Sequence, residues 1–177
     1  IDSLQGTDGV VMSGATITAT SAQAVTKANV TKLDGFTNAL VTVASVKDTR
    51  SNVTDIAGLA GVDMSNAVAT IDDAVSLSEA EDLDKLTEGK ITLSAVKDTY
   101  ANVQDIKAID DARVDMGVAA VQVTSQTNIT EINDLRGDTA GNITIDDVSE
   151  SRANLETING YGDVSLASAN ISVTDVV

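Results

Sequence analysis

The sequence predicts an α/β fold, a right-handed repeat solenoid in which short parallel strands alternate with helices over about six coils. Three observations lead to this prediction. One segment recurs almost literally with a period of about fifty residues, a second series recurs with the same period, and a helical motif occurs twice in each period. A fixed period of this length is the sequence signature of repeat architectures.

The literal repeat and the second series are interlocked. The literal repeat reads SVKDTRSNVTDI at 45–56, AVKDTYANVQDI at 95–106 and DVSESRANLETI at 147–158. The second series reads VVM at 10–12, VDM at 62–64 and 114–116, and VSL at 164–166. Each of these triplets leads past an alanine into a strand-like run, so both series divide the chain into the same periods.

The helices are predicted from a motif of Asn or Asp, an aliphatic residue, any residue, a polar residue and a second aliphatic residue. Aliphatic residues three apart, with polar residues between them, form one stripe along a helix. The motif occurs at 29–33, 52–56, 82–86, 102–106, 128–132 and 154–158. We expect its first aliphatic residues to stack in one buried column: Val30, Val53, Leu83, Val103, Ile129 and Leu155.

The strands are predicted from alternating, β-branched segments at 40–43, 91–93, 121–123, 143–145 and 171–173. Because a helix between two strands returns the chain to the same end, these strands run parallel. A coil of about 23 or 28 residues cannot bury its apolar side alone, so the coils have to stack. We expect a single array over residues 1–177. The alternative is a compact doubly wound α/β domain, which does not need near-identical coils.

The two ends of the chain look like inner coils rather than polar capping repeats. Aligned on the period, residues 3–6 correspond to the helix tail at 55–58, and the chain stops just after the strand at 171–173. Stacked coils without caps expose apolar ends. We therefore expect an excised part of a longer array, or a protomer that associates with other copies of itself or with flanking repeats.

Composition excludes several classes of function. The net charge is −16, which argues against binding to nucleic acid or anionic lipid. The chain has no Cys and no His, and no apolar run approaches the roughly 18 residues of a membrane span. General acid–base catalysis would fall to paired carboxylates or lysines, and no isolated pair, phosphate loop or nucleophile elbow is present. We expect no enzyme activity.

The candidate metal ligands are Asp72, Asp73, Asp146 and Asp147, which lie in two related Thr-Ile-Asp-Asp contexts. Calcium takes carboxylate ligands in flexible loops, but neither context has the spacing of a known calcium loop. Each pair is predicted to lie between a strand and a helix, where Asp caps the helix N-terminus. Helix capping is the first interpretation and calcium the alternative; no cofactor is otherwise required.

Two polar patterns have both a structural and a functional interpretation. Glycosylation sequons begin at Asn29, Asn52, Asn128, Asn142 and Asn170, and three of these lie in the helical motif, where Asn can satisfy backbone groups of a turn. Outward strand positions hold Thr42, Thr92 and Thr144, with Gln122 and Ser172 in comparable places. Such a face could bind a polysaccharide, but Thr is also an ordinary solvent-facing strand residue.

The VKDTRSNVTDI, VKDTYANVQDI and VSESRANLETI segments, with their ITL and ITI strands, resemble the repeat arrays of large secreted bacterial cell-surface proteins. The resemblance covers nearly the whole chain and implies an extracellular, cell-surface location in an S-layer, an adhesin or a filament. It also implies that calcium often helps such arrays to fold, although this chain lacks the nonapeptide calcium repeats of many relatives. A structural, self-associating segment is therefore expected. The alternative is a module that recognises carbohydrate or a surface.

Overall fold

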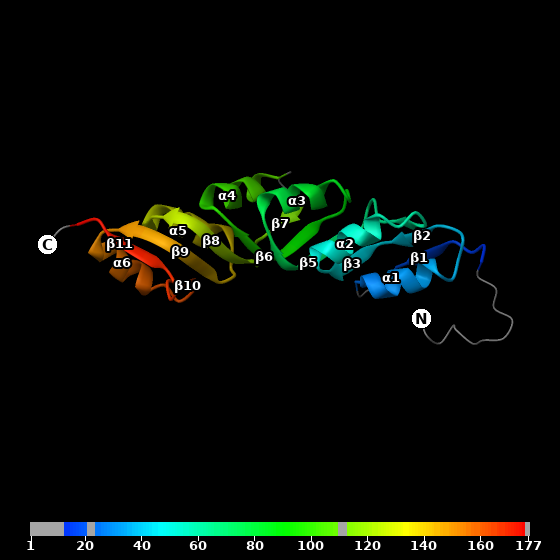
Figure 1. The fold of residues 1–177 in the computed structure, drawn as a ribbon, viewed down its shortest axis with the longest axis horizontal. Helices are drawn as coiled ribbons and strands as arrows, with labels where there is room; N and C mark the ends of the chain where they lie inside the picture. Colours follow the sequence, from blue (N-terminus) through cyan, green and yellow to red (C-terminus); the bar gives the residue numbers. More distant parts are fainter. Residues whose placement is uncertain (1–12, 21–23, 110–112, 176–177) are drawn as a thin grey trace. The chain divides into compact units, whose positions relative to one another are not determined.

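The computed structural model describes residues 13–20, 24–109 and 113–175. In this part of the chain, six helices alternate with parallel strands and no barrel closes (Figure 1). The α/β class and the alternation of helices with parallel strands are confirmed.

The helices are separated by alternating shorter and longer intervals. Their first residues lie 23, 27, 23, 29 and 23 positions apart. The helices are α1 (Lys27–Asp34), α2 (Arg50–Ala57), α3 (Leu77–Asp84), α4 (Tyr100–Ala108), α5 (Ile129–Asp138) and α6 (Arg152–Asn159). We call a helix together with the strands that follow it, up to the next helix, a helix–strand segment.

Strands of two to eight residues occupy the intervals. The two-residue strands occur only after α2, α4 and α6, where the intervals are longer. The strands are β1 (Ile17–Ala19), β2 (Val41–Val43), β3 (Ser45–Asp48), β4 (Val62–Asp63), β5 (Val68–Val75), β6 (Ile91–Asp98), β7 (Val114–Asp115), β8 (Ala120–Thr127), β9 (Ile143–Glu150), β10 (Val164–Ser165) and β11 (Asn170–Val173).

The chain folds into two compact units. The first holds the described residues up to 72 together with 82–91, and the second holds 73–81 and the described residues from 92 onward. In the first unit β2 pairs with β1 and β4, and β3 pairs with the first half of β5. In the second unit β8 pairs with β6 and β9, and β9 also pairs with β10 and β11.

Three strands are longer than the sequence indicates, and one of them is β8, which covers Ala120–Thr127 where alternation predicts 121–123. Alternation predicts strands at 91–93 and 143–145, but β6 continues to Asp98 and β9 to Glu150. The interval between successive core-facing aliphatic residues widens from two to three after Leu93 and after Ile145. The second half of each strand therefore lacks the alternating pattern by which a strand is predicted. Pairing maintains that half, because Ala95–Asp98 pairs with Ala120–Val123 and β11 pairs with 147–150.

The N-termini of α2, α4, α5 and α6 are capped by hydroxyl and amide side chains. The hydroxyl oxygens of Thr49, Thr99 and Ser151 each accept a hydrogen bond from a backbone N–H in the first turn of the following helix. Asn128 and Glu131 form a reciprocal capping box at the start of α5. These caps satisfy N–H groups that have no partner inside a helix.

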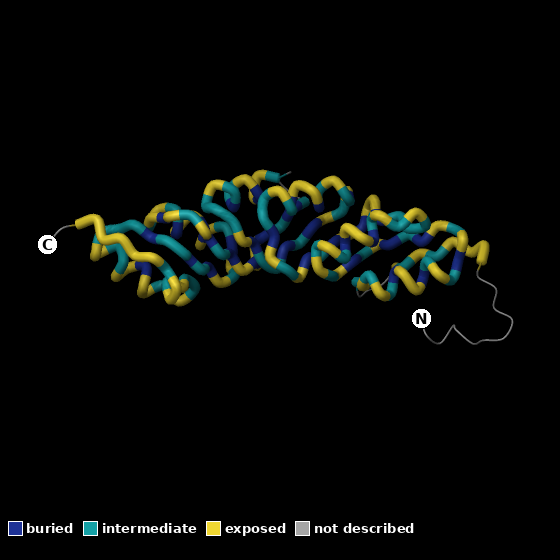
Figure 2. Tube along the Cα trace, in the orientation of Figure 1, coloured by how far each residue is buried: buried dark blue, intermediate teal, exposed yellow. Residues whose placement is uncertain are grey.

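The core contains the fourth and seventh residues of each helix. Eleven of these twelve side chains are buried, and Leu155 is half-buried (Figure 2). The fourth residues are Val30, Val53, Ala80, Val103, Ile132 and Leu155, and the seventh residues are Leu33, Ile56, Leu83, Ile106, Leu135 and Ile158.

The expected burial of the first aliphatic residues is therefore wrong at Ile129 and Leu155, and Leu83 is buried at a different position of its helix. Ile129 is the first residue of α5 and is only half-buried, and its place in the core is taken by Ile132. Leu83 is buried, but as a seventh residue, beside Ala80 in the fourth position. Leu155 has the expected position but not the expected burial.

Candidate interaction surface

Three of the four candidate metal ligands contact side chains of neighbouring strands. Asp72 forms an ion pair with Lys47, with 3.4 Å between Oδ1 and Nζ. Asp146 accepts from Gln122 Nε2 through both oxygens at 3.0 Å, and Asp147 accepts from Gln126. In the described part of the chain, no three acidic side chains gather closely enough to hold a metal ion. A calcium role for Asp72, Asp73, Asp146 and Asp147 stays a prediction.

The prediction that these acids cap the helices after them is wrong. Asp72 and Asp73 lie inside β5, which continues to Val75, and Asp146 and Asp147 lie inside β9. The N-cap of α6 is Ser151. The prediction failed because both strands continue several residues beyond the end of their alternating pattern, so these acids lie in strands and not at helix starts.

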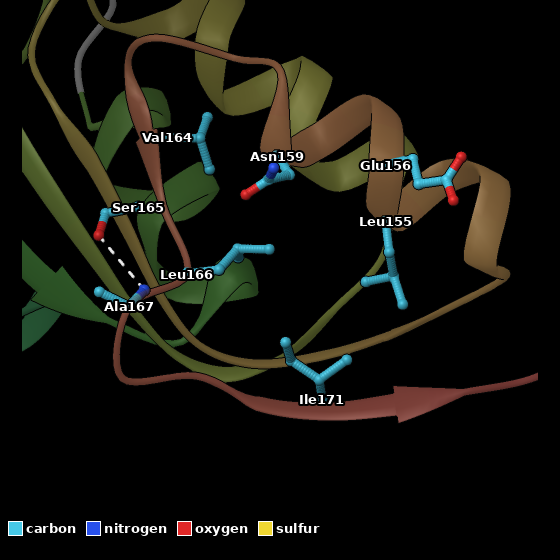
Figure 3. Close-up of a pocket in the computed structure, with 8 residues that line it drawn as sticks. All are labelled: Leu155, Glu156, Asn159, Val164, Ser165, Leu166, Ala167 and Ile171. Carbon is cyan, nitrogen blue, oxygen red and sulfur yellow. Dashed lines mark hydrogen bonds between the residues drawn. The ribbon is translucent and has the colours of Figure 1, made fainter.

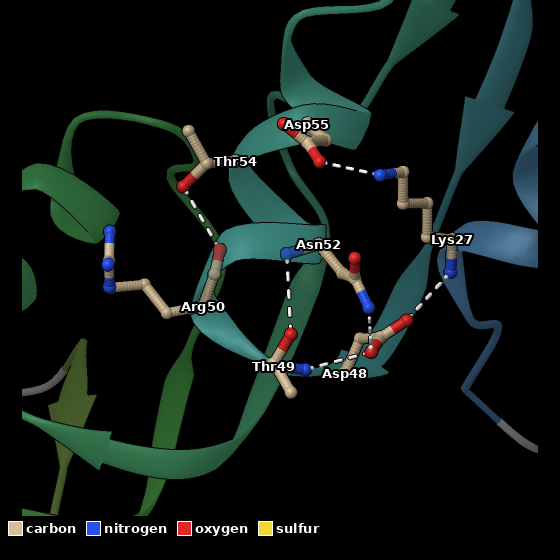
Figure 4. A network of polar contacts seen from close by, with 7 residues as sticks. All are labelled: Lys27, Asp48, Thr49, Arg50, Asn52, Thr54 and Asp55. Atoms are coloured by element: carbon tan, nitrogen blue, oxygen red, sulfur yellow. Dashed lines mark hydrogen bonds and ion pairs between the residues drawn. The ribbon is translucent and has the colours of Figure 1, made fainter.

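Other acids bind helix N-termini, at three equivalent places that we call acid clamps. In the first, Asp48 accepts from the backbone N–H of Lys27 at 2.9 Å, from the N–H of Thr49 at 2.9 Å and from Asn52 Nδ2 at 2.7 Å (Figure 4). One carboxylate therefore joins the start of α1 to the start of α2. A negative charge near two helix N-termini also suits their dipoles.

The same geometry recurs in the second unit. Asp98 accepts from the N–H groups of Leu77 and Thr99 and from the Asn102 amide. The third acid clamp is formed by Glu150, which accepts from the N–H groups of Ile129 and Ser151 and from the Asn154 amide. The repeated Asn of the helical motif thus binds a carboxylate at three helix starts. The sequence signal for this role is an acid that recurs directly before the capping Thr or Ser.

The hydrogen bonds in the acid clamps favour the ionised carboxylates. Burial by itself raises the pKa of Asp98, but the bonds from Leu77, Thr99 and Asn102 outweigh it, so the pKa lies below its ordinary value of 3.8. The pKa of Glu150 is lowered chiefly by the Ile129 N–H. The carboxylates of the acid clamps are therefore charged at neutral pH.

The face of the strands that carries the predicted threonines is polar and half-exposed. Thr42, Thr92 and Thr144 are all half-exposed, and Thr144 pairs in register with Gln122. A shallow hollow of about 220 Å³ on this face is lined by Lys97, Gln122 and Thr144 among small residues. Its lining contains no aromatic ring.

Both tyrosines contact α5 instead. The hydroxyl of Tyr100 donates to Asp134 at 3.0 Å, and burial together with this bond raises the pKa of Tyr100 to about 12. The hydroxyl of Tyr161 donates to Asn133, and the Arg136 guanidinium lies 3.9 Å from the centre of its ring. The side chains that would best support carbohydrate recognition are thus engaged in contacts within the second unit.

A threonine loop joins each of α1, α3 and α5 to its strand. We call residues 37–40, 87–90 and 139–142 the entry loops. Their threonine hydroxyls donate to the carbonyl oxygens of Ala15, Ala67 and Ala119 at 2.6, 2.7 and 2.7 Å. Thr37, Thr87 and Thr139 are buried although they are polar. Sequence reasoning missed them, although all three recur at the fifty-residue period.

The entry loops 87–90 and 139–142 lie against the turns 64–67 and 116–119 of the preceding helix–strand segments, and the turn 166–169 has the same place after α6. We call 64–67, 116–119 and 166–169 the receiving turns. They are closed by the N–H groups of Ala67, Ala119 and Ala169, which donate to the carbonyl oxygens of the first residues at 2.9, 2.9 and 3.0 Å. All three receiving turns therefore have the same conformation.

The third receiving turn and β11 form an edge that no described strand covers. Among the described residues, β11 pairs only with β9. Ile171 and Val173 are 53% and 57% exposed, whereas the equivalent Val121 and Val123 of β8 are 1% and 0% exposed. We call this surface, made by the turn 166–169 and β11, the β11 edge.

A hollow of about 580 Å³ lies beside the β11 edge (Figure 3). Leu155 and Glu156 of α6, Leu166 of the turn and Ile171 of β11 contribute to its lining. Leu166 is half-buried here, whereas Met64 and Met116 at the same place in the other receiving turns are buried. The apolar side chains of this last helix–strand segment are thus only partly covered.

We also searched the described helices for membrane spans and compared the chain with known proteins. None of the six described helices has the length and hydropathy that a membrane span requires. Comparison of the chain with family models, with curated proteins and with solved structures finds no match.

Proposed function

We propose that this chain is a structural segment of an extracellular surface assembly, such as an S-layer, a filament or an adhesin stalk. Its helix–strand segments are coils of one solenoid over residues 1–177, and it works by associating with other copies of itself or with flanking repeats. The regular recurrence of acid clamps and entry loops supports the solenoid, because each contact joins one coil to the next.

The proposal of self-association rests on the exposed aliphatic side chains of the β11 edge. Strand positions that are fully buried in β8 are more than half exposed in β11. Exposed strand edges with aliphatic side chains are templates for pairing with another chain. An assembly that adds coils at this edge would bury the same side chains again.

The extracellular location is supported by the resemblance of the repeated VKDT segments to secreted surface arrays. The alternative function, recognition of a surface carbohydrate, would use the polar strand face around Thr144. The structural function is favoured because that face lacks an aromatic ring in its hollow and both tyrosines contact α5.

Light scattering tests the self-association. We expect the wild-type chain to form larger species as its concentration rises, and the double variant Ile171→Lys/Val173→Lys to stay monomeric. Val118→Lys is the control, because Val118 is 68% exposed but lies in an inner receiving turn. The experiment needs about 0.15 M salt, since a net charge of −16 makes copies repel one another. A wild-type chain that remains monomeric at high concentration would contradict the proposal.

Small-angle scattering of the monomeric double variant tests the solenoid. A compact domain of this length has a radius of gyration of about 16 Å. Coils that stack in one direction give a clearly larger value, and a value near that of a compact domain would favour the doubly wound alternative.

A further inference from the structure

The entry loops make the same three hydrogen bonds to the preceding helix–strand segment wherever that contact is described. Besides the threonine hydroxyl bond, the N–H groups of Asn38, Glu88 and Ala140 donate to the carbonyl oxygens of Ser13, Ser65 and Gly117 at 2.9, 2.6 and 2.8 Å. In return, the N–H groups of Ile17, Ala69 and Val121 donate to the carbonyl oxygens of Leu40, Lys90 and Asn142 at 3.2, 2.8 and 2.9 Å. The entry loops thus recognise the turns of the preceding segments through one repeated set of backbone and threonine hydrogen bonds.

The β11 edge presents the same three groups. Aligned on the receiving turns, Ala167 corresponds to Gly117, Ala169 to Ala119 and Ile171 to Val121. The register supports this alignment, because Ile171 pairs with Val148 as Val121 pairs with Val96. The turn is already closed by the bond from Ala169 to Leu166, so these groups need no rearrangement to accept a partner.

We propose that the β11 edge is a docking site for a helix–strand segment of the α5 type, which enters through a Thr-x-Gly-x-Ile loop. The inference deepens the proposed function, on which it rests, by naming the partner segment. The incoming threonine donates to the Ala169 carbonyl, the next N–H donates to the Ala167 carbonyl, and the Ile171 N–H donates to the residue before the incoming strand. That strand then lies parallel to β11.

Two of the three entry loops have glycine at the position of close approach, whereas the first has Ala39 there and still bonds to the Ala15 carbonyl. A Cβ on Gly141 would lie 2.1 Å from the carbonyl oxygen of Ala119, and a Cβ on Gly89 would lie 2.2 Å from that of Ala67. Backbone oxygens cannot move away as a flexible side chain does. We therefore expect a β-branched residue at this position of a partner loop to keep the loop away from the Ala169 carbonyl.

The hollow beside the edge accommodates the apolar side of the incoming segment. Leu155, Leu166 and Ile171 line it and are incompletely buried. Covering them gives the favourable hydrophobic contribution to docking, while the three hydrogen bonds fix the register.

The test uses the full chain and a synthetic peptide of residues 128–150, which contains α5, its entry loop and β9. Binding is measured by fluorescence anisotropy of the labelled peptide, and the site is located by hydrogen exchange. We expect the peptide to bind and the Ile171 amide to exchange more slowly. Ile171→Lys in the chain should abolish binding without changing the circular dichroism spectrum.

Two peptide variants test the loop itself. Thr139→Val removes the hydroxyl donor and should weaken binding about tenfold. Gly141→Val should abolish binding because its side chain meets the Ala169 carbonyl. No binding of the wild-type peptide at millimolar concentration, or equal binding of the Gly141→Val peptide, would overturn the inference.

The experiments distinguish failure of the proposed self-association from failure of the docking site. A chain that forms larger species in light scattering but does not bind the peptide refutes the docking site and leaves self-association standing. A chain that binds the peptide but never self-associates refutes the proposed self-association and leaves the docking site standing.

Discussion

The segments that end in β8 and in β11 follow one pattern and differ in what covers them. Both have a short strand, a closed receiving turn and a longer strand. That longer strand pairs in the same register with the long strand of the preceding segment, β8 with β6 and β11 with β9. The side chains of Val121 and Val123 are buried, whereas those of Ile171 and Val173 are more than half exposed. The difference is that β8 also pairs with β9.

This comparison shows that a helix–strand segment does not bury its own apolar side. The side chains of β8 are covered only when the α5 segment adds its entry loop and its strand. Stability should therefore depend on contacts between neighbouring segments, as it does in repeat proteins generally. Equivalent substitutions in the covered and uncovered segments measure this dependence.

The largest effect is expected where the backbone of one segment approaches that of the next. Gly141→Val places a side chain against the carbonyl oxygen of Ala119, so the loop has to withdraw from the receiving turn. We expect a loss of about 3 kcal/mol in the free energy of unfolding, measured with urea. Gly162→Val is the control, because a Cβ at Gly162 has nothing within 4 Å. Equal losses in both variants would show that the close approach does not matter.

An intermediate effect is expected from one substitution made at two equivalent strand positions. Val123→Ala removes two buried methyl groups and leaves a cavity, which should cost about 2 to 3 kcal/mol. Val173→Ala acts on a side chain that is 57% exposed and should change the free energy of unfolding by less than about 0.5 kcal/mol. If Val173→Ala were as costly as Val123→Ala, residues near Val173 would have to be covered in solution.

The smallest effect is expected at the acid clamps. Asp98→Asn removes a carboxylate that binds the start of α3 and should cost about 1 kcal/mol at pH 7. Because the pKa of Asp98 is lowered from 3.8, its contribution is complete above that value and disappears as the pH falls through the lower folded value. Urea unfolding between pH 7 and pH 2.5 should therefore show the two curves converging below about pH 4.

Asp175→Asn is the matched control for Asp98→Asn. Asp175 accepts from the Arg152 N–H at 2.8 Å but is exposed in the last segment. We expect a smaller loss than for Asp98→Asn, since water competes for an exposed hydrogen bond. A difference between wild type and Asp98→Asn that stays constant down to the lowest pH would contradict the assigned role of the carboxylate.

The local sequence was sufficient to place most helices but not to set the register of α3 and α5, and α5 shows the reason. The same Asn-aliphatic motif begins at Asn52, inside α2, and at Asn128, which is the N-cap of α5. The difference arises in the strand before the helix. β8 continues to Thr127, whose hydroxyl donates to the Asp147 carbonyl at 3.0 Å, so α5 cannot begin earlier. That bond joins residues of two different segments, and no local pattern contains it.

By itself, the sequence determined the α/β class, the alternation of helices with parallel strands and the aliphatic pairs that α1, α2, α4 and α6 contribute to the core. These features follow from periodicity, because a helix or strand with one apolar face must bury that face. The tertiary structure decided the lengths of β6, β8 and β9, the acids that cap helices and the burial of Thr37, Thr87 and Thr139. Each of these depends on a backbone group of a neighbouring segment that has to be satisfied across a gap of twenty or more residues.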